Sequence, residues 1–355
     1  MKKIALVIPN NLWVSPYISI YTLLFDNLKI EYDIISWDRE GREEVGIQFH
    51  YKEKKRNQIA VLWSYLKYSR FLKKTIEKNG YEKLIVFTPQ VGIFLSSFLE
   101  KKYKGRYILD YRDLSLEQKP IFAKLFRRVL LNSYANVISS PGFKRYLPQG
   151  FEYMVSHNFN VKIVKKILAE DSKPYSENLT TILTIGALRT DMNREVMDAL
   201  GNVTGFEMSF VGKGIAADYL ENYAKDRGYK NIVFTGYYKK EEEPSIYKQH
   251  AFVNIVYPLI PSHISALSNR FYNSLIYKRP MIVTRGTVQG DYAEKYGVGL
   301  VIDDCEDLDL KLNEYRMKID FSMYSKQCNM LLDVFLKDNN KFEDMVYCFV
   351  NNTNS

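Results

Sequence analysis

Three segments decide the fold of the second half of this chain: TIGALR (184–189), FVGKG (210–214) and FTGY (234–237). Each ends a short apolar run at a glycine. Continuous apolar runs bounded by turn residues are typical of strands buried on both faces of a parallel sheet. Ligands bind outside the carboxyl ends of such strands, where glycine lets the backbone approach a nucleotide. We therefore predict a nucleotide site lined by Gly186, Gly212, Lys213, Gly236 and Tyr237.

Further strand-length apolar runs occur along the whole chain, separated by helix-length amphipathic stretches. In the second half they are 182–185, 207–211, 232–234, 251–256, 281–283 and 299–302. In the first half they are 4–8, 32–37, 84–88, 107–110 and 137–140. This alternation predicts an α/β protein with two doubly wound, Rossmann-like domains, each built on a parallel sheet.

The length of 355 residues also favours two domains of ordinary size. Residues 169–180 are polar, contain a proline and interrupt the apolar periodicity, so we predict a linker there. The expected domains are 1–168 and 181–323. Residues 324–355 then form a closing helix and tail that could pack back across the linker.

The composition is that of a globular protein with a sizeable core, since 46% of the residues are hydrophobic and 26% are charged. We find no apolar run long enough to span a bilayer, and the apolar start is too short for a signal peptide. Cys305, Cys328 and Cys348 lack metal-ligand spacing, so we interpret them as structural thiols in a reducing compartment. These features predict a cytoplasmic protein.

Positive charge is concentrated in the first half of the chain. Residues 1–165 hold 28 Lys and Arg against 15 Asp and Glu, whereas the remainder holds 22 against 26. A basic face attracts nucleic acid, anionic lipid or a phosphorylated substrate. The slightly acidic second half must bind any anion with a few placed groups.

The segment 268–283 predicts a short helix that stops at Pro280 and leads into a buried strand. Arg270 and Asn273 lie three residues apart and therefore share one helix face. They could supply a guanidinium fork for a diphosphate and an amide for a ribose hydroxyl. The alternative is a solvated arginine and a surface asparagine.

The order of these signals resembles the GT-B glycosyltransferases, specifically the retaining, family-4-like enzymes that use nucleotide sugars in bacterial capsule, O-antigen and exopolysaccharide synthesis. The resemblance spans most of the chain. It rests on five segments of the second half: 186–189, 212–214, 234–236, 269–273 and 279–283. In the first half, LDYRDL (109–114), Ser139-Ser140 and His157-Asn158 are similar to segments that face the cleft in such enzymes.

The resemblance implies roles for individual residues. Arg189 and Arg270 are expected to bind the diphosphate and Asn273 the ribose, with Ser265 and Asn269 in the same donor site. The loop 9–15, which contains Asn10 and Asn11, is expected to contact the sugar or the leaving phosphate. Asp113 and His157 are expected on the acceptor side of the cleft.

This chain also departs from the family pattern. The family commonly has two glutamates eight positions apart, but Ser265 and Asn273 occupy those places here. Asparagine can still hydrogen-bond a ribose. Arg270 replaces the family lysine, which keeps the positive charge and changes its geometry.

Transfer to a hydroxyl requires stabilisation of the leaving nucleoside diphosphate as negative charge develops. Arg189, Arg270 and a helix N-terminus could supply it, so we expect neither a metal nor another cofactor. The resemblance implies that the leaving phosphate helps to deprotonate the acceptor. Asp113 is a candidate base or positioning group; the alternative is a helix cap or a structural salt bridge.

Two basic segments with aromatic residues suggest contact with an anionic membrane. The segment 119–131 predicts a helix with four cations, and 52–74 combines basic residues with Trp63. For 119–131, a core helix with one basic edge is an equal alternative. Since no nucleic-acid-binding motif is present, the sequence favours a lipid-linked saccharide acceptor at the inner face of the cell membrane.

The sequence therefore predicts a glycosyltransferase of the hexosyltransferase type. Two alternatives stay open. Loss of both family glutamates would suit a non-catalytic partner subunit, and the same fold also serves nucleotide-sugar 2-epimerase-like isomerases.

Overall fold

The computed structural model describes residues 3–52, 57–169, 180–189 and 194–351. The chain forms two compact units: residues 1–158 with 338–355, and residues 159–337. The sequence had divided the chain at 168 and 323 instead. Most of the predicted linker 169–180 lies outside the described residues.

Unit 1 contains a parallel sheet whose described strands run in the order β3-β2-β1-β4-β5-β6-β7. The strands are β1 (Ile4–Val7), β2 (Tyr32–Asp38), β3 (Ile47–His50), β4 (Lys83–Phe87), β5 (Tyr107–Tyr111), β6 (Ala135–Ile138) and β7 (Met154–Val155). The central strands β1, β4 and β5 are buried at every position, because helices cover both faces of the sheet.

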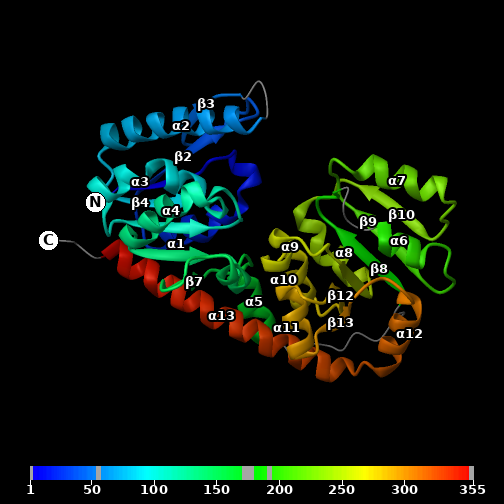
Figure 1. The fold of residues 1–355 in the computed structure, drawn as a ribbon. Helices are drawn as coiled ribbons and strands as arrows, with labels where there is room; N and C mark the ends of the chain where they lie inside the picture. The colour runs from blue at the N-terminus through cyan, green and yellow to red at the C-terminus, as the bar shows by residue number, and fades with distance from the viewer. Residues whose placement is uncertain (1–2, 53–56, 170–179, 190–193, 352–355) are drawn as a thin grey trace. The chain divides into compact units, whose positions relative to one another are not determined.

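The helices of unit 1 are α1 (Ser19–Asn27), α2 (Gln58–Asn79), α3 (Pro89–Tyr103) and α4 (Pro120–Asn132) (Figure 1). Helix α2 begins where the Asn57 side chain accepts a hydrogen bond from the Ala60 amide, and it ends at Gly80 in the left-handed conformation. Short 3₁₀ helices occupy Leu12–Val14, Pro16–Ile18, Leu116–Gln118 and Pro141–Arg145.

Unit 2 repeats the architecture with a parallel sheet in the order β10-β9-β8-β11-β12-β13 among its described strands. These strands are β8 (Thr181–Ile185), β9 (Glu207–Val211), β10 (Ile232–Gly236), β11 (Phe252–Ile255), β12 (Met281–Thr284) and β13 (Gly299–Ile302). The two doubly wound parallel-sheet domains predicted from the sequence are therefore confirmed.

The helices of unit 2 are α5 (Val161–Ala169), α6 (Arg194–Leu200), α7 (Ala217–Asp226), α8 (Glu243–Gln249), α9 (Pro261–Ser265), α10 (Asn269–Ile276), α11 (Val288–Tyr296) and α12 (Leu308–Lys318). A 3₁₀ turn at Lys240–Glu242 precedes α8. No helix among the described residues is long and apolar enough to cross a membrane.

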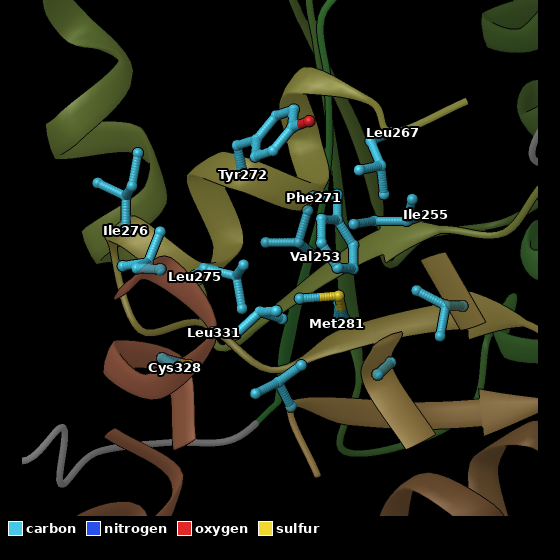
Figure 2. Close-up of a cluster of buried hydrophobic side chains, with 14 of the residues drawn as sticks. Val253, Ile255, Leu267, Phe271, Tyr272, Leu275, Ile276, Met281, Cys328 and Leu331 are labelled. Atoms are coloured by element: carbon cyan, nitrogen blue, oxygen red, sulfur yellow. The ribbon is translucent and has the colours of Figure 1, made fainter. Parts of the chain in front are cut away.

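The C-terminal helix α13 (Phe321–Asn351) contributes side chains to the cores of both units. Cys328 and Leu331 lie in the core of unit 2 beside Leu275 and Met281, as Figure 2 shows. Further along the helix, Phe342, Val346 and Phe349 enter the core of unit 1. Each unit is therefore completed by a segment of the same helix.

We expect Phe342→Ala to lower the free energy of unfolding of unit 1 by about 3–5 kcal/mol, because it leaves a cavity where the fully buried ring packs edge-on against Tyr21. Tyr347→Ala is the matched control on the same helix, since that ring is 54% exposed; it should cost less than about 0.5 kcal/mol. Urea unfolding measures both. Equal costs would show that α13 does not complete unit 1.

Candidate functional site

The order of strands in unit 2 reverses between β8 and β11, and the side chain of Arg270 spans this point. Its Nε donates to the carbonyl oxygen of Ile185 at the end of β8, and its Nη1 lies 3.5 Å from the carbonyl oxygen of Asn254 on β11. Ligands of open α/β sheets bind outside the carboxyl ends of the strands at such a point. Arg270 as a whole residue is 7% exposed, so a positive charge lies buried where a ligand is expected.

Helix α10 positions Arg270 in its first turn. The Ser268 hydroxyl oxygen accepts a hydrogen bond from the Phe271 amide, and the hydroxyl donates to Gln289 Oε1 at 2.7 Å. At the N-terminus of a helix, backbone amide groups of the first turn point away from the helix, and the helix dipole is positive there. The predicted helix and the shared face of Arg270 and Asn273 are both present.

Asn273 lies one turn further along α10 and contacts a carboxylate from another helix. Its Nδ2 lies 3.4 Å from Oε2 of Glu243, the first residue of α8, and the Tyr238 hydroxyl donates to Glu243 Oε1 at 3.1 Å. The sequence analysis missed Glu243. The signal that could have found it is the acidic run 241–243, which follows the third glycine-ending strand and precedes Pro244 at a helix start.

The charges of Arg270 and Glu243 act on the same two phenols. Burial is the main reason why the pKa of Tyr238 and of Tyr247 is raised. Glu243 raises both pKa values further, whereas Arg270 lowers them. The Asn273 side chain also lowers the pKa of Tyr247. Hydrogen bonds join Glu243, Asn273 and Tyr238, and Arg270 lies one turn before Asn273 on the same helix. We call these residues, with Tyr247, the Arg270 cluster.

The glycines after β8 and β9 let two neighbouring loops approach each other. A Cβ at Gly212, whose φ is 138°, would lie 2.1 Å from the carbonyl oxygen of Gly186. The two loops are joined by hydrogen bonds from the Gly186 amide to Val211 and from the Leu188 amide to Lys213. Packing between loops thus accounts for Gly212, in addition to the ligand approach that we predicted.

The other predicted donor residues of unit 2 lie at different depths. Arg189, Lys213 and Asn269 are exposed, and the Tyr237 side chain is 74% exposed. Ser265 is fully buried, and its hydroxyl donates to the carbonyl oxygen of Pro261. Arg189 and Lys213 thus place positive charge on the surface after β8 and β9. The Ser265 hydroxyl, in contrast, makes a hydrogen bond within α9.

A cavity of about 590 Å³ in unit 2 includes the carboxyl ends of β11, β12 and β13 in its lining. Its charged residues are Arg194, Glu195, Asp198, Arg227, Asp303 and Asp304. Because carboxylates outnumber arginines there, it suits a diphosphate less well than the Arg270 cluster does.

In unit 1 the predicted loop residues are held by internal hydrogen bonds. Asn11 is 2% exposed; its Nδ2 donates to Asp38, and its Oδ1 accepts from the Arg39 amide. Asn10 is half-buried beside it. His157 is completely buried with its amide donating to Asn339, and burial lowers its pKa. Asn11 and His157 therefore stabilise the loop and the α13 contact, rather than lying on an accessible surface.

The segment 109–114 carries a buried charge pair at the carboxyl end of β5. Asp110 accepts two hydrogen bonds from Arg112 and one from the Tyr21 hydroxyl, at 2.8 Å. Arg112 Nη1 is buried and has no hydrogen-bond partner within the part of the chain that the structure describes. Asp113 is exposed beside this pair. Sequence reasoning selected Asp113 from LDYRDL and gave Arg112 of the same segment no role of its own.

Comparison with known proteins reveals the same fold in solved structures. Sucrose-phosphate synthase from Thermosynechococcus elongatus aligns with a TM-score of 0.69 and 11% identity over 98% of both chains. The lipopolysaccharide outer core galactosyltransferase WaaB gives 0.64 and 15% over 97% of this chain and 99% of that one. HepE of Anabaena in complex with UDP gives 0.66 and 11% over 98% and 100%.

No protein-family model and no curated protein sequence matches this chain. The structural likeness, at these low identities, concerns the fold. It confirms the GT-B fold that the sequence predicted.

We expect Gly212→Ala to lower the melting temperature more than Gly205→Ala does. Both positions have positive φ, so both substitutions incur backbone strain of about 1–3 kcal/mol. At Gly205 the added Cβ meets nothing within 4 Å, whereas at Gly212 it collides with Gly186 and pushes the loops apart. Thermal denaturation measures the difference; equal shifts would show that the loops do not need this close contact.

Proposed function

We propose that this chain transfers a sugar from a nucleotide-sugar donor to a lipid-linked saccharide during assembly of a bacterial surface polysaccharide, with retention of configuration. Unit 2 binds the donor, and unit 1 binds the acceptor. The fold shared with WaaB, which is described as a galactosyltransferase, supports this proposal, and so does the UDP in the structure of HepE.

The buried guanidinium of Arg270 is the observation that carries the proposal. The guanidinium donates to two neutral carbonyl groups, those of Ile185 and Asn254. Among the described residues, no carboxylate forms an ion pair with Arg270. A buried cation without a counter-charge is costly, so the site favours an anionic ligand. A nucleoside diphosphate at the carboxyl ends of β8 and β11 would supply that charge.

The reaction breaks the bond between the sugar carbon and the diphosphate oxygen and forms a bond to the acceptor hydroxyl oxygen. The electron pair of the broken bond leaves with the diphosphate. Arg270, Arg189 and the N-terminus of α10 stabilise the negative charge that develops there. The acceptor proton passes to the leaving phosphate or to Asp113. The nucleotide-sugar donor is a substrate, and this chemistry needs no cofactor.

Helix α2 offers a surface suited to an anionic membrane. Ile59, Trp63 and Leu66 are 68%, 57% and 37% exposed. Their spacing places them on one helix face, which Arg70 and Lys74 continue. Aromatic and aliphatic side chains beside cations are typical of helices that lie in the membrane interface.

Helix α4 is less suited to that role than the sequence suggested, because Phe126, Val129 and Leu130 are buried in unit 1. Its exposed apolar residues are Ile121 and Leu131. We therefore assign the peripheral membrane contact to α2.

We expect one nucleoside diphosphate among UDP, GDP and dTDP to raise the melting temperature, by linkage equivalent to about 2.7 kcal/mol at 100 times its Kd. Arg270→Ala should abolish that shift. Arg279→Ala is the matched control: it also removes a buried arginine that donates to backbone carbonyls, those of Tyr247 and Lys248. It should lower stability but keep the shift. A shift that survives Arg270→Ala would remove Arg270 from the site.

We expect the protein to float with vesicles that contain about one third anionic phosphatidylglycerol, and Trp63→Ala to weaken binding roughly tenfold by removing one interfacial aromatic side chain. Leu131→Ala, on α4, is the control and should bind like the wild type. The reverse pattern would assign membrane contact to α4, and equal binding to neutral vesicles would rule out charge attraction.

A further inference from the structure

Glu243 contacts, through Asn273, the helix α10 that also carries the buried cation Arg270. It follows β10 through the loop 237–242 and begins α8. Tyr247, one turn later on α8, packs in the same core cluster as Leu183 and Ile185 of β8 and Phe271 of α10. The start of α8 is thereby held next to the N-terminal half of α10.

Two hydrogen bonds fix the Glu243 carboxylate, and the carboxylate can accept further hydrogen bonds. The Asn273 amide contacts one oxygen and the Tyr238 hydroxyl contacts the other. A carboxylate accepts about four hydrogen bonds. Glu243 is half-buried, as are Asn273 and Tyr238, so a ligand from solvent can reach the group.

A nucleoside diphosphate presents two different chemical groups to such a site. Its diphosphate requires a cation, which Arg270 supplies. Its ribose carries two neighbouring hydroxyls that donate hydrogen bonds, and the two oxygens of a carboxylate accept such a pair. Hydrogen bonds to a charged acceptor are about twice as strong as those to a neutral amide.

We propose that Glu243 binds the ribose hydroxyls of the nucleotide and that Asn273 is a positioning residue which holds the Glu243 carboxylate. This assignment rests on the proposed function, since it takes the nucleotide site for granted. The sequence suggested Asn273 as the direct ribose ligand, and Glu243 takes that role instead. The amide of Asn273 then acts through Glu243, whose Oε2 lies 3.4 Å from the Asn273 Nδ2.

The test compares Glu243→Gln with wild type by calorimetric titration of UDP and GDP and of their 2′,3′-dideoxy analogues. We expect the variant to bind the ribonucleotide at least about tenfold more weakly, because it loses hydrogen bonds to a charged group. Binding of the dideoxy analogue should be unchanged. Glu241→Gln, in the same acidic run and exposed, is the control and should leave both affinities unchanged.

A second variant keeps the test informative if Glu243→Gln disturbs folding. The double variant Glu243→Gln with Asn273→Glu exchanges the positions of the carboxylate and the amide. We expect this double variant to regain the preference for the ribonucleotide over the dideoxy analogue. Equal losses for both analogues, or no loss, would overturn the role of Glu243 while leaving the proposed function intact. Failure of the wild type to bind any nucleotide would overturn both.

Discussion

The guanidinium of Arg270 holds together the two strands between which the order of the second sheet reverses. Its contacts with the carbonyl groups of Ile185 and Asn254 join the ends of β8 and β11. The helix that carries it is capped by Ser268, and its other face packs in the core through Phe271 and Leu275. The position of the cation is therefore set by the core of unit 2 rather than by a mobile surface side chain.

Burial of this charge has a thermodynamic consequence. Transfer of an unpaired cation to a protein interior costs several kcal/mol, and neutral carbonyl oxygens offset part of that cost. On the proposed function a diphosphate would offset more, and the folded unit would be preorganised for it. Arg112 in unit 1 differs, because Asp110 neutralises its charge. Its Nη1 is nevertheless buried without a hydrogen-bond partner among the described residues.

Most of the fold could be predicted from the sequence because the central strands are buried on both faces and therefore appear as continuous apolar runs. The two strands that were missed lack this property: β3 is IQFH at an edge and half-buried, and β7 has two residues. The division into units could not be predicted well, since a helix shared by two cores has one continuous amphipathic pattern. Its contribution to each core depends on contacts distant in sequence.

The candidate site was predictable to the extent that it follows strand ends. Gly212 was selected for that reason, whereas Arg270 was selected from its place near the start of the predicted helix in 268–283 and from the resemblance. Glu243 was missed because its partner Asn273 lies thirty residues later, and a pair of this kind is defined by packing of α8 against α10. Asn11 and His157 look like ligands in the sequence, but the structure uses their polar atoms for internal hydrogen bonds.

The most direct measurement is a crystal structure of the protein with a nucleoside diphosphate bound. We expect the diphosphate within hydrogen-bond distance of Arg270 and the amides of the first turn of α10. A diphosphate bound instead in the cavity lined by Arg194 and Arg227 would contradict the claim that the buried cation defines the donor site.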